Sequence, residues 1–155
     1  MTYKPQKVRR VYIPKPGSSK ERPLGIPAYE DRIVQLAVSK ILTAIYEQTF
    51  LNSSYGFRPG RNCHDALRKL NDDIMTKKVN WVVDADISGF FDHVDHQWMM
   101  KCLEVRIRDK SLLRIIARML KAGIMDKGEF EPSLEGIPQG GLCKALHKVV
   151  LSVRF

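Results

Sequence analysis

A short apolar run that ends in carboxylates constrains the fold of this chain more than any other feature. Residues 81–87 read Trp-Val-Val-Asp-Ala-Asp-Ile. Aromatic and β-branched residues in so short a run predict a buried strand with acidic side chains at its C-terminal end. Asp84 and Asp86 lie two positions apart, so on a strand they share one face. Such a pair suits Mg²⁺, although the spacing alone also fits two solvated loop acids.

The other periodic segments predict an α/β fold. A strand is expected over 8–14 and a returning strand over 22–26, with a basic turn at 15–20 between them. Apolar residues at helical spacing predict helices over about 29–48, 62–77, 97–106 and 110–122. Asn62 and Asp109 are the expected N-caps of the second and fourth helices. Residues 123–141 contain turn residues and no long period, so no element is predicted there.

The charge balance favours a polyanionic partner. The 155 residues include 26 Lys and Arg against 17 Asp and Glu, a formal net charge of +9. Cations that neutralise phosphates release condensed counterions, which favours nucleic acid, but ribosomal proteins, nucleases and membrane-surface proteins share this surplus. The sequence has neither a membrane-spanning apolar run nor a secretory signal. This gives no reason to expect a membrane partner. Cys63, Cys102 and Cys143 lack disulfide or metal spacing, so we expect a cytoplasmic, intracellular protein of bacterial type, with an organellar origin as the alternative.

The acidic run leads into the first recognisable motif. Residues 86–96, Asp-Ile-Ser-Gly-Phe-Phe-Asp-His-Val-Asp-His, resemble the first catalytic motif of group II intron reverse transcriptases. The resemblance implies that Asp86 is the catalytic, metal-binding carboxylate, with the Ile87 carbonyl as a second ligand and Asp84 as a neighbour. The metal would be Mg²⁺, with Mn²⁺ as an alternative. Phe91 would be the aromatic gate that excludes a 2′-hydroxyl from the incoming nucleotide.

Residues 22–27, Arg-Pro-Leu-Gly-Ile-Pro, are similar to the fingers motif of the same family. The resemblance implies that Lys15 and Arg22, on a hairpin, contact the triphosphate of the incoming nucleotide. Arg suits this role because its guanidinium donates two parallel hydrogen bonds to phosphate. The length of the turn leaves Lys20 as an alternative to Lys15, and without the family the segment reads as a solvated basic hairpin.

Two more segments follow the family's order. Residues 56–61, Gly-Phe-Arg-Pro-Gly-Arg, look like its second motif, which implies template contacts by Arg58 and Arg61. Residues 136–141, Gly-Ile-Pro-Gln-Gly-Gly, resemble the start of its second palm element. There Gln139 would line the nucleotide pocket, and Gly140 would let the backbone approach the primer–template. Each segment alone is an ordinary loop or turn, and the signal lies in four such segments in one order.

The resemblance implies the fingers and an incomplete palm of a right-hand polymerase, with mixed helices and a small antiparallel sheet. A partial reverse transcriptase domain would span 1–141: fingers over about 1–79, the first palm strand and motif over 80–96, a helical region over 97–135, and the start of the second palm element over 136–141. Residues 142–155 depart from the family pattern. The implied activity is RNA-directed DNA synthesis, with intron RNA as template, a DNA primer and deoxynucleoside triphosphates (dNTP) as partners. The motifs set no oligomeric state.

The family's second metal-binding element, an aromatic-x-Asp-Asp hairpin, occurs nowhere in the sequence. We therefore expect a truncated, marginally stable chain with weak or no polymerase activity and Asp86 on an exposed sheet edge. The alternative is a non-catalytic, maturase-like fragment that binds RNA and assists splicing. A different Mg²⁺-dependent phosphotransferase or nuclease would explain the carboxylates but not the ordered motifs. His93 and His96 lack a third distant ligand candidate, and we interpret them as structural.

Overall fold

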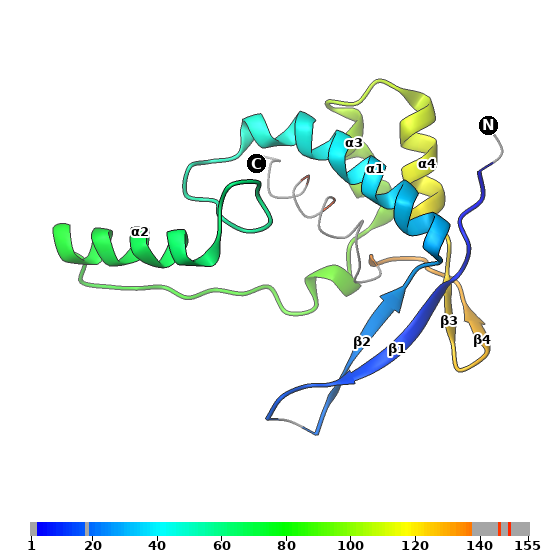
Figure 1. The fold of residues 1–155 in the computed structure, drawn as a ribbon, viewed down its shortest axis with the longest axis horizontal. Helices are drawn as coiled ribbons and strands as arrows, with labels where there is room; N and C mark the ends of the chain where they lie inside the picture. Colours follow the sequence, from blue (N-terminus) through cyan, green and yellow to red (C-terminus); the bar gives the residue numbers. More distant parts are fainter. Residues whose placement is uncertain (1–2, 18, 138–145, 147–148, 150–155) are drawn as a thin grey trace.

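The computed structural model describes residues 3–17 and 19–137 together with positions 146 and 149. Within this part, the chain forms four α-helices and a four-stranded sheet (Figure 1). The strands are β1 (Val8–Pro14), β2 (Glu21–Ile26), β3 (Ile124–Asp126) and β4 (Glu129–Glu131). The helices are α1 (Tyr29–Tyr46), α2 (Cys63–Thr76), α3 (His96–Glu104) and α4 (Lys110–Leu120), with 3₁₀ turns at Glu47–Thr49 and Phe90–Asp92. The predicted α/β class is confirmed.

The sheet has the order β2-β1-β3-β4 and is mixed, where an antiparallel sheet was expected. β1 pairs antiparallel with β2 and parallel with β3, and β3 and β4 form an antiparallel hairpin. Sequence reasoning missed this second hairpin. Its two-residue turn is Lys127-Gly128, and both residues have positive φ, +48° and +94°. Such a turn matches the strand twist, so Lys-Gly between two short runs was the available signal.

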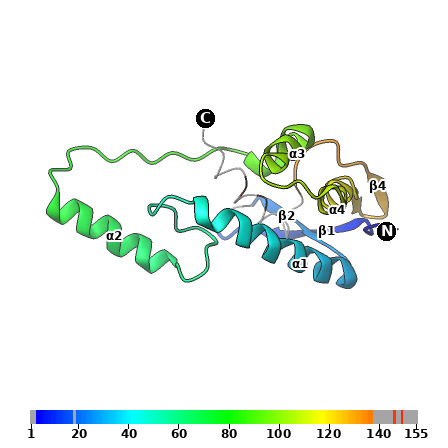
Figure 2. The ribbon, with the colours of Figure 1, turned by 90° about the horizontal axis from the view of Figure 1, so that it is seen from above.

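The core lies among the helices and leaves most of the sheet exposed. α1 contributes a stripe of Val38, Leu42 and Tyr46, and Figures 1 and 2 show α1 lying next to α3 and α4. These three helices share one cluster of buried apolar side chains. Leu146 and Val149 are also fully buried in this cluster. These two residues lie within 142–155, the range that we expected to depart from the family pattern, and both belong to the core.

Side-chain caps set the starts of α2, α3 and α4, whereas α1 has none. Asn62 and Asp65 form a reciprocal capping box on α2, with Asp65 N donating to Asn62 Oδ1 at 3.0 Å. Asp109 accepts from the backbone N–H of Ser111 at 2.7 Å and caps α4, so both predicted caps are confirmed. Asp95 caps α3 in the same way, and α3 begins one residue before the predicted start.

The N-terminal segment is held on the helical core by a buried carboxylate. Asp31 is 2% exposed and accepts hydrogen bonds from the Gln6 backbone N–H, at 2.8 Å, and from the Tyr3 hydroxyl. Arg118 on α4 donates to the Tyr3 carbonyl at 2.7 Å. These contacts fix the direction in which the chain enters β1, and so the position of the β1–β2 hairpin.

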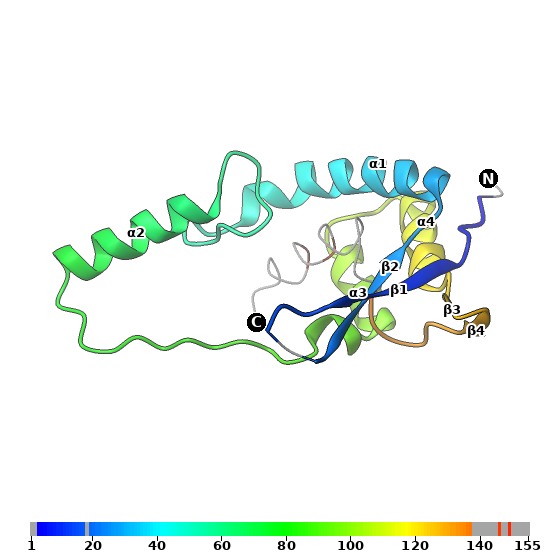
Figure 3. The same cartoon turned by 60° about the horizontal axis from the view of Figure 1, so that its bottom comes forward.

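The predicted buried strand at Trp81–Ile87 is wrong for this structure. The segment is unpaired, and Trp81 and Val83 are 89% and 88% exposed. Together with α2, which buries none of its residues, it extends away from the helical core (Figures 1 and 3). The physical reason is that a strand needs a neighbour for its backbone donors and acceptors, and no described strand lies beside this segment.

Candidate nucleotide and nucleic-acid site

A pocket of about 350 Å³ lies between the β1–β2 hairpin and the turn that carries the first motif. We call it the hairpin pocket. The hairpin contributes Arg10, Tyr12 and residues 23–25, and the motif contributes Phe91 and Asp92. The remaining wall is formed by Ile124, Ser133 and residues 135–137. The pocket therefore joins three of the segments that the sequence singled out, which lie far apart along the chain.

Phe91 is placed on the pocket wall by a 3₁₀ turn. Gly89 begins this turn in the left-handed region, with φ +64°, and its carbonyl accepts from the Asp92 N–H at 2.9 Å. Phe90 packs edge-on against Phe91, with ring centroids 5.2 Å apart. The Phe91 carbonyl accepts from the Ile137 N–H at 2.7 Å. The Phe91 backbone is thus held from both sides, which gives its ring a defined place at the pocket.

Two residues of the pocket wall, Arg10 and Tyr12, belong to a network with acidic side chains of the β3–β4 hairpin. Arg10 pairs with Asp126 at 3.3 Å and with Glu131 at 2.7 Å, and the Tyr12 hydroxyl donates to Asp126. The hydrogen bond from Tyr12 is the main cause of the lowered pKa of Asp126; burial opposes it, and the hydrogen bond from Arg10 adds to the lowering. The same bond to Asp126 raises the pKa of Tyr12. The network ties β1 to the β3–β4 hairpin and keeps Arg10 at the pocket.

Lys15 and Arg22 lie on the β1–β2 hairpin, both exposed, and neither lines the pocket. The Lys15 N–H closes the turn by donating to the Lys20 carbonyl at 3.0 Å. Arg22 pairs with Ile13 across the hairpin. Because side chains alternate along a strand, Ile13 and Arg22 lie on the face opposite to Tyr12. Their predicted contact with a triphosphate remains a prediction.

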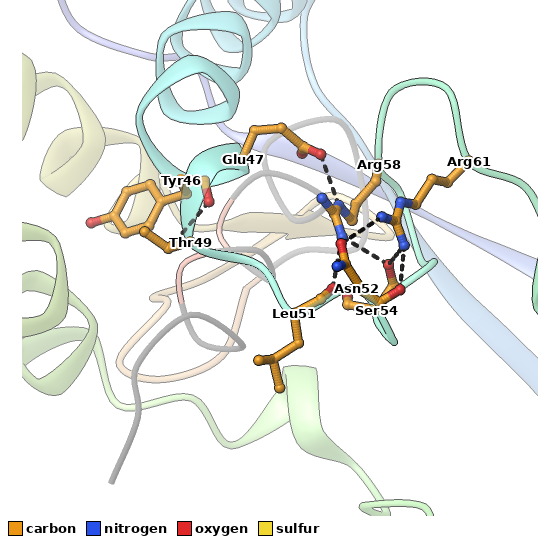
Figure 4. Close-up of polar contacts among 8 residues, drawn as sticks. All are labelled: Tyr46, Glu47, Thr49, Leu51, Asn52, Ser54, Arg58 and Arg61. Carbon is orange, nitrogen blue, oxygen red and sulfur yellow. Dashed lines mark hydrogen bonds and ion pairs between the residues drawn. The ribbon is translucent and has the colours of Figure 1, made fainter.

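Arg58 and Arg61 brace the loop that carries them (Figure 4). Arg58, with 8% of its side chain exposed, pairs with Glu47 at 2.7 Å and donates to the carbonyls of Leu51 and Ser54 at 2.9 and 3.0 Å. Its guanidinium also lies 5.1 Å from the centre of the Phe50 ring.

Arg61 donates to the Asn52 carbonyl and, at 3.2 Å, to the Asn52 side-chain oxygen. It lies 5.2 Å from the centre of the Tyr55 ring. Both arginines therefore have structural partners within the loop, and their predicted template contacts remain predictions.

Asp86 and Ile87 lie at the end of the exposed segment that precedes the 3₁₀ turn. The resemblance implies a divalent metal here, and the donor types fit one. The Asp86 carboxylate and the Ile87 carbonyl are hard oxygen ligands, and Mg²⁺ binds few protein groups and completes its shell with water and phosphates. Among the residues that the structure describes, no group of three His, Cys, Asp or Glu comes together as a metal cluster. A metal bound at Asp86 would complete its coordination shell with water and phosphate oxygens.

Two predicted site residues, Gln139 and Gly140, lie outside the described residues. Sequence reasoning missed Arg10 and Tyr12 as pocket residues, since only the fold brings β1 next to Phe91. It also assigned no partner to His96, which is buried against Gly136. The sequence carried only a weak signal for the roles of Arg10, Tyr12 and His96. A buried histidine needs a polar partner, but its identity depends on the tertiary structure.

The comparisons with known proteins identify the family. Residues 13–145 match the model described as "Reverse transcriptase (RNA-dependent DNA polymerase)", and the chain belongs to this family. The chain is 41% identical over 145 residues to the group II intron-encoded protein LtrA of Lactococcus lactis subsp. cremoris, covering 94% of the chain and 24% of the relative. It is 43% identical over 156 residues to protein YkfC of Escherichia coli (strain K12). This match covers 99% of the chain and 41% of the relative.

A plant relative extends this set. The chain is 35% identical over 95 residues to nuclear intron maturase 1, mitochondrial, of Arabidopsis thaliana, covering 61% of the chain and 13% of the relative. The resemblance to group II intron reverse transcriptases is confirmed. The chain spans only 24% and 41% of the length of the two bacterial relatives. Within the described residues, no helix is both long and apolar enough to cross a membrane.

Proposed function

We propose that this chain supplies the nucleotide-binding part of an RNA-directed DNA polymerase of the group II intron type. The observation that carries the proposal is that Phe91, singled out by the first motif, lies on the wall of a pocket formed with the β1–β2 hairpin. The hairpin pocket would take the base and sugar of an incoming dNTP. Lys15 and Arg22 lie outside this pocket on the same hairpin, and in this proposal they contact the triphosphate. Gln139 would line the same site, and Phe91 would exclude a 2′-hydroxyl.

In this proposal Asp86 is the catalytic carboxylate and holds Mg²⁺, or Mn²⁺ in its place, together with the Ile87 carbonyl. The metal supplies charge stabilisation for phosphoryl transfer. Intron RNA would be the template and DNA the primer, with Arg58, Arg61 and Gly140 on the nucleic-acid side. The net charge of +9 supports a nucleic-acid partner. The cytoplasm is the proposed location, because the template and the dNTP are available there.

Nucleotide binding by the purified chain tests this proposal. We expect dATP to bind in a Mg²⁺-dependent way, and Asp86→Ala to weaken this binding about tenfold or more, because a charged ligand contact is lost. Asp84→Ala is the matched control, since it removes a carboxylate two positions away and should change little. Equal effects of the two substitutions, measured by isothermal titration calorimetry, would contradict the role of Asp86.

Primer extension on an intron RNA template separates the two candidate functions. The 155 residues contain no aromatic-x-Asp-Asp segment, so we expect this chain by itself to bind RNA and extend no primer. RNA binding should weaken with salt and survive Asp86→Ala with its salt dependence unchanged. RNA binding without any dATP binding would favour the alternative, a non-catalytic RNA-binding fragment that assists splicing. Template-dependent synthesis by the chain would overturn the expectation of inactivity.

A further inference from the structure

The turn that carries Phe91 is clamped to the segment at Gly136 and Ile137 by three hydrogen bonds. The Ile137 N–H donates to the Phe91 carbonyl at 2.7 Å, and the Gly136 N–H donates to the Val94 carbonyl at 2.9 Å. The third bond, 2.6 Å long, joins His96 Nε2 to the Gly136 carbonyl. It is the only one of the three that depends on the identity of a side chain.

Burial and a hydrogen bond fix the position of the His96 side chain. It is the first residue of α3 and is only 7% exposed. A carbonyl oxygen accepts hydrogen bonds and donates none, so His96 must carry its proton on Nε2 to make this contact. A buried ring nitrogen without such a partner would be destabilising. The Gly136 carbonyl therefore determines both the tautomer and the orientation of the ring.

Gly136 leaves the clamp no room to shift. Its φ is +76°, and a Cβ at this position would lie 2.7 Å from the Asp92 carbonyl oxygen and 3.1 Å from the Phe91 carbonyl oxygen. The two backbones are therefore as close as a glycine permits. Phe91, Asp92, Gly136 and Ile137 all line the hairpin pocket, so the distance between the two segments sets the width of one side of the pocket.

We propose that His96 is a positioning residue for sugar discrimination in the hairpin pocket. Its bond to the Gly136 carbonyl holds the Phe91 turn against the opposite segment, and so keeps the pocket too narrow for a ribose. This inference rests on the proposed function, in which the pocket takes the incoming nucleotide. His96 touches no substrate in this scheme and acts through the backbone that carries Phe91.

Three substitutions at position 96 test the role of the donor. His96→Phe fills a similar volume and removes the hydrogen bond, whereas His96→Gln places an amide N–H near the position of Nε2. The readout is the ratio of the dissociation constants for ATP and dATP with Mg²⁺, measured by titration calorimetry. We expect His96→Phe and His96→Leu to lower this ratio about tenfold, the size of effect that one hydrogen bond supports, and His96→Gln to restore it.

His64→Phe is the matched control. His64 lies on α2, is exposed and does not line the hairpin pocket, so its substitution should leave the ratio unchanged. Circular dichroism checks that each variant is folded. If the substitutions at position 96 unfold the chain, Gly136→Ala provides the second route, because its methyl group pushes the two segments apart without changing His96. It should also lower the ratio.

The outcomes distinguish a failure of the role of His96 from a failure of the proposed nucleotide-binding function. A wild-type chain that prefers dATP, together with a His96→Phe or Gly136→Ala variant that is folded and equally selective, would overturn the inference and leave the proposed function standing. A wild-type chain that binds neither nucleotide would overturn the proposed function, and the inference with it. A lowered ratio in His96→Phe that His96→Gln does not restore would also count against the hydrogen bond.

Discussion

At the residue scale, Arg58 shows how a motif residue becomes part of the scaffold. The sequence places it in a basic loop that resembles a template-binding motif, and the structure surrounds its guanidinium with the Glu47 carboxylate and two carbonyls. One oxygen of Glu47 is buried without a hydrogen-bond partner among the described residues, so this carboxylate depends on Arg58. Spacing could identify the arginine but not its partners.

Removing Arg58 should therefore destabilise the protein. We expect Arg58→Ala to lower the free energy of unfolding by about 3 kcal/mol, because it leaves the Glu47 carboxylate partly buried and unpaired. Urea denaturation measures the change. Arg68→Ala is the control, since its pair with Asp65 has an arginine side chain that is 78% exposed and should contribute little. Equal losses in the two variants would show that the burial of Arg58 has no consequence for stability.

Leu146 carries a second prediction at this scale. It lies in the range that we expected to depart from the family pattern, and its side chain is fully buried in the helical core. We expect Leu146→Ala to cost roughly 2–5 kcal/mol, the usual range for a leucine truncated inside a core. Leu134→Ala is the control, because Leu134 is 83% exposed. A Leu146→Ala variant as stable as the wild type in urea would mean that Leu146 does not pack in the core in solution.

At the scale of elements, α2 and α4 differ in what holds them. Both have side-chain N-caps that the sequence predicted, but α4 buries Leu113, Ile116, Met119 and Leu120, whereas α2 buries no residue. A helix without a packed face depends on its caps and its own side-chain pairs, such as Lys69 with Asp73. Propensity and capping were readable from the sequence, and packing was not.

The cap of α2 should accordingly have a local effect. Asn62→Ala removes the capping box and should destabilise α2 by about 1 kcal/mol. Because α2 has no buried face, we expect faster amide exchange within Cys63–Thr76 and little change in global unfolding. Asp109→Ala, on the packed helix α4, should instead lower global stability. Global destabilisation by Asn62→Ala would indicate that α2 packs on the rest of the protein.

The stability that comes from the junction of β1 with the β3–β4 hairpin should depend on pH, because Asp126 titrates there. Hydrogen bonds from Tyr12 and Arg10 lower the pKa of Asp126 from an ordinary value of about 3.9. A lowered folded-state pKa contributes stability that is fully present above this ordinary value and is lost as pH falls through the lowered pKa. We expect the wild type to lose stability faster than Asp126→Asn below about pH 4. Parallel pH profiles in urea denaturation would contradict this.

At the scale of the whole molecule, the segment Trp81–Ile87 determines whether the catalytic motif of the family lies on a sheet, because it carries Asp86. Its composition predicts a buried strand, but in the structure it connects α2 to the Phe90–Asp92 turn without a partner. Asp86 is accordingly exposed, but it lies in an unpaired segment and not on the sheet edge that we expected. The hairpin pocket, in contrast, is assembled from segments that the described fold brings together.

Trp81 tests this arrangement. A buried tryptophan would cost about 3–5 kcal/mol on truncation to alanine, whereas an exposed one should change stability by no more than about 0.5 kcal/mol. Because Trp81 is 89% exposed, we expect Trp81→Ala to unfold at the same urea concentration as the wild type. Trp98→Phe, which leaves Trp81 as the sole tryptophan, should show the emission of a solvent-exposed indole. A blue-shifted spectrum would mean that this segment is covered in solution.

The sequence by itself determined the four helices, the β1–β2 hairpin and the family. Periodicity predicted α1, α2, α3 and α4, caps at Asn62 and Asp109 set two of their starts, and four ordered motifs indicated a reverse transcriptase. These signals are local or additive along the chain, so they need no knowledge of neighbours in space.

Only the tertiary structure decided which residues share a site. Arg10 and Tyr12 line the same pocket as Phe91, and His96 forms a hydrogen bond with Gly136. Arg58 stabilises its own loop, and Trp81 is exposed. Hydrogen bonding and burial depend on what lies across from a residue, and in a folded chain that neighbour comes from a distant part of the sequence.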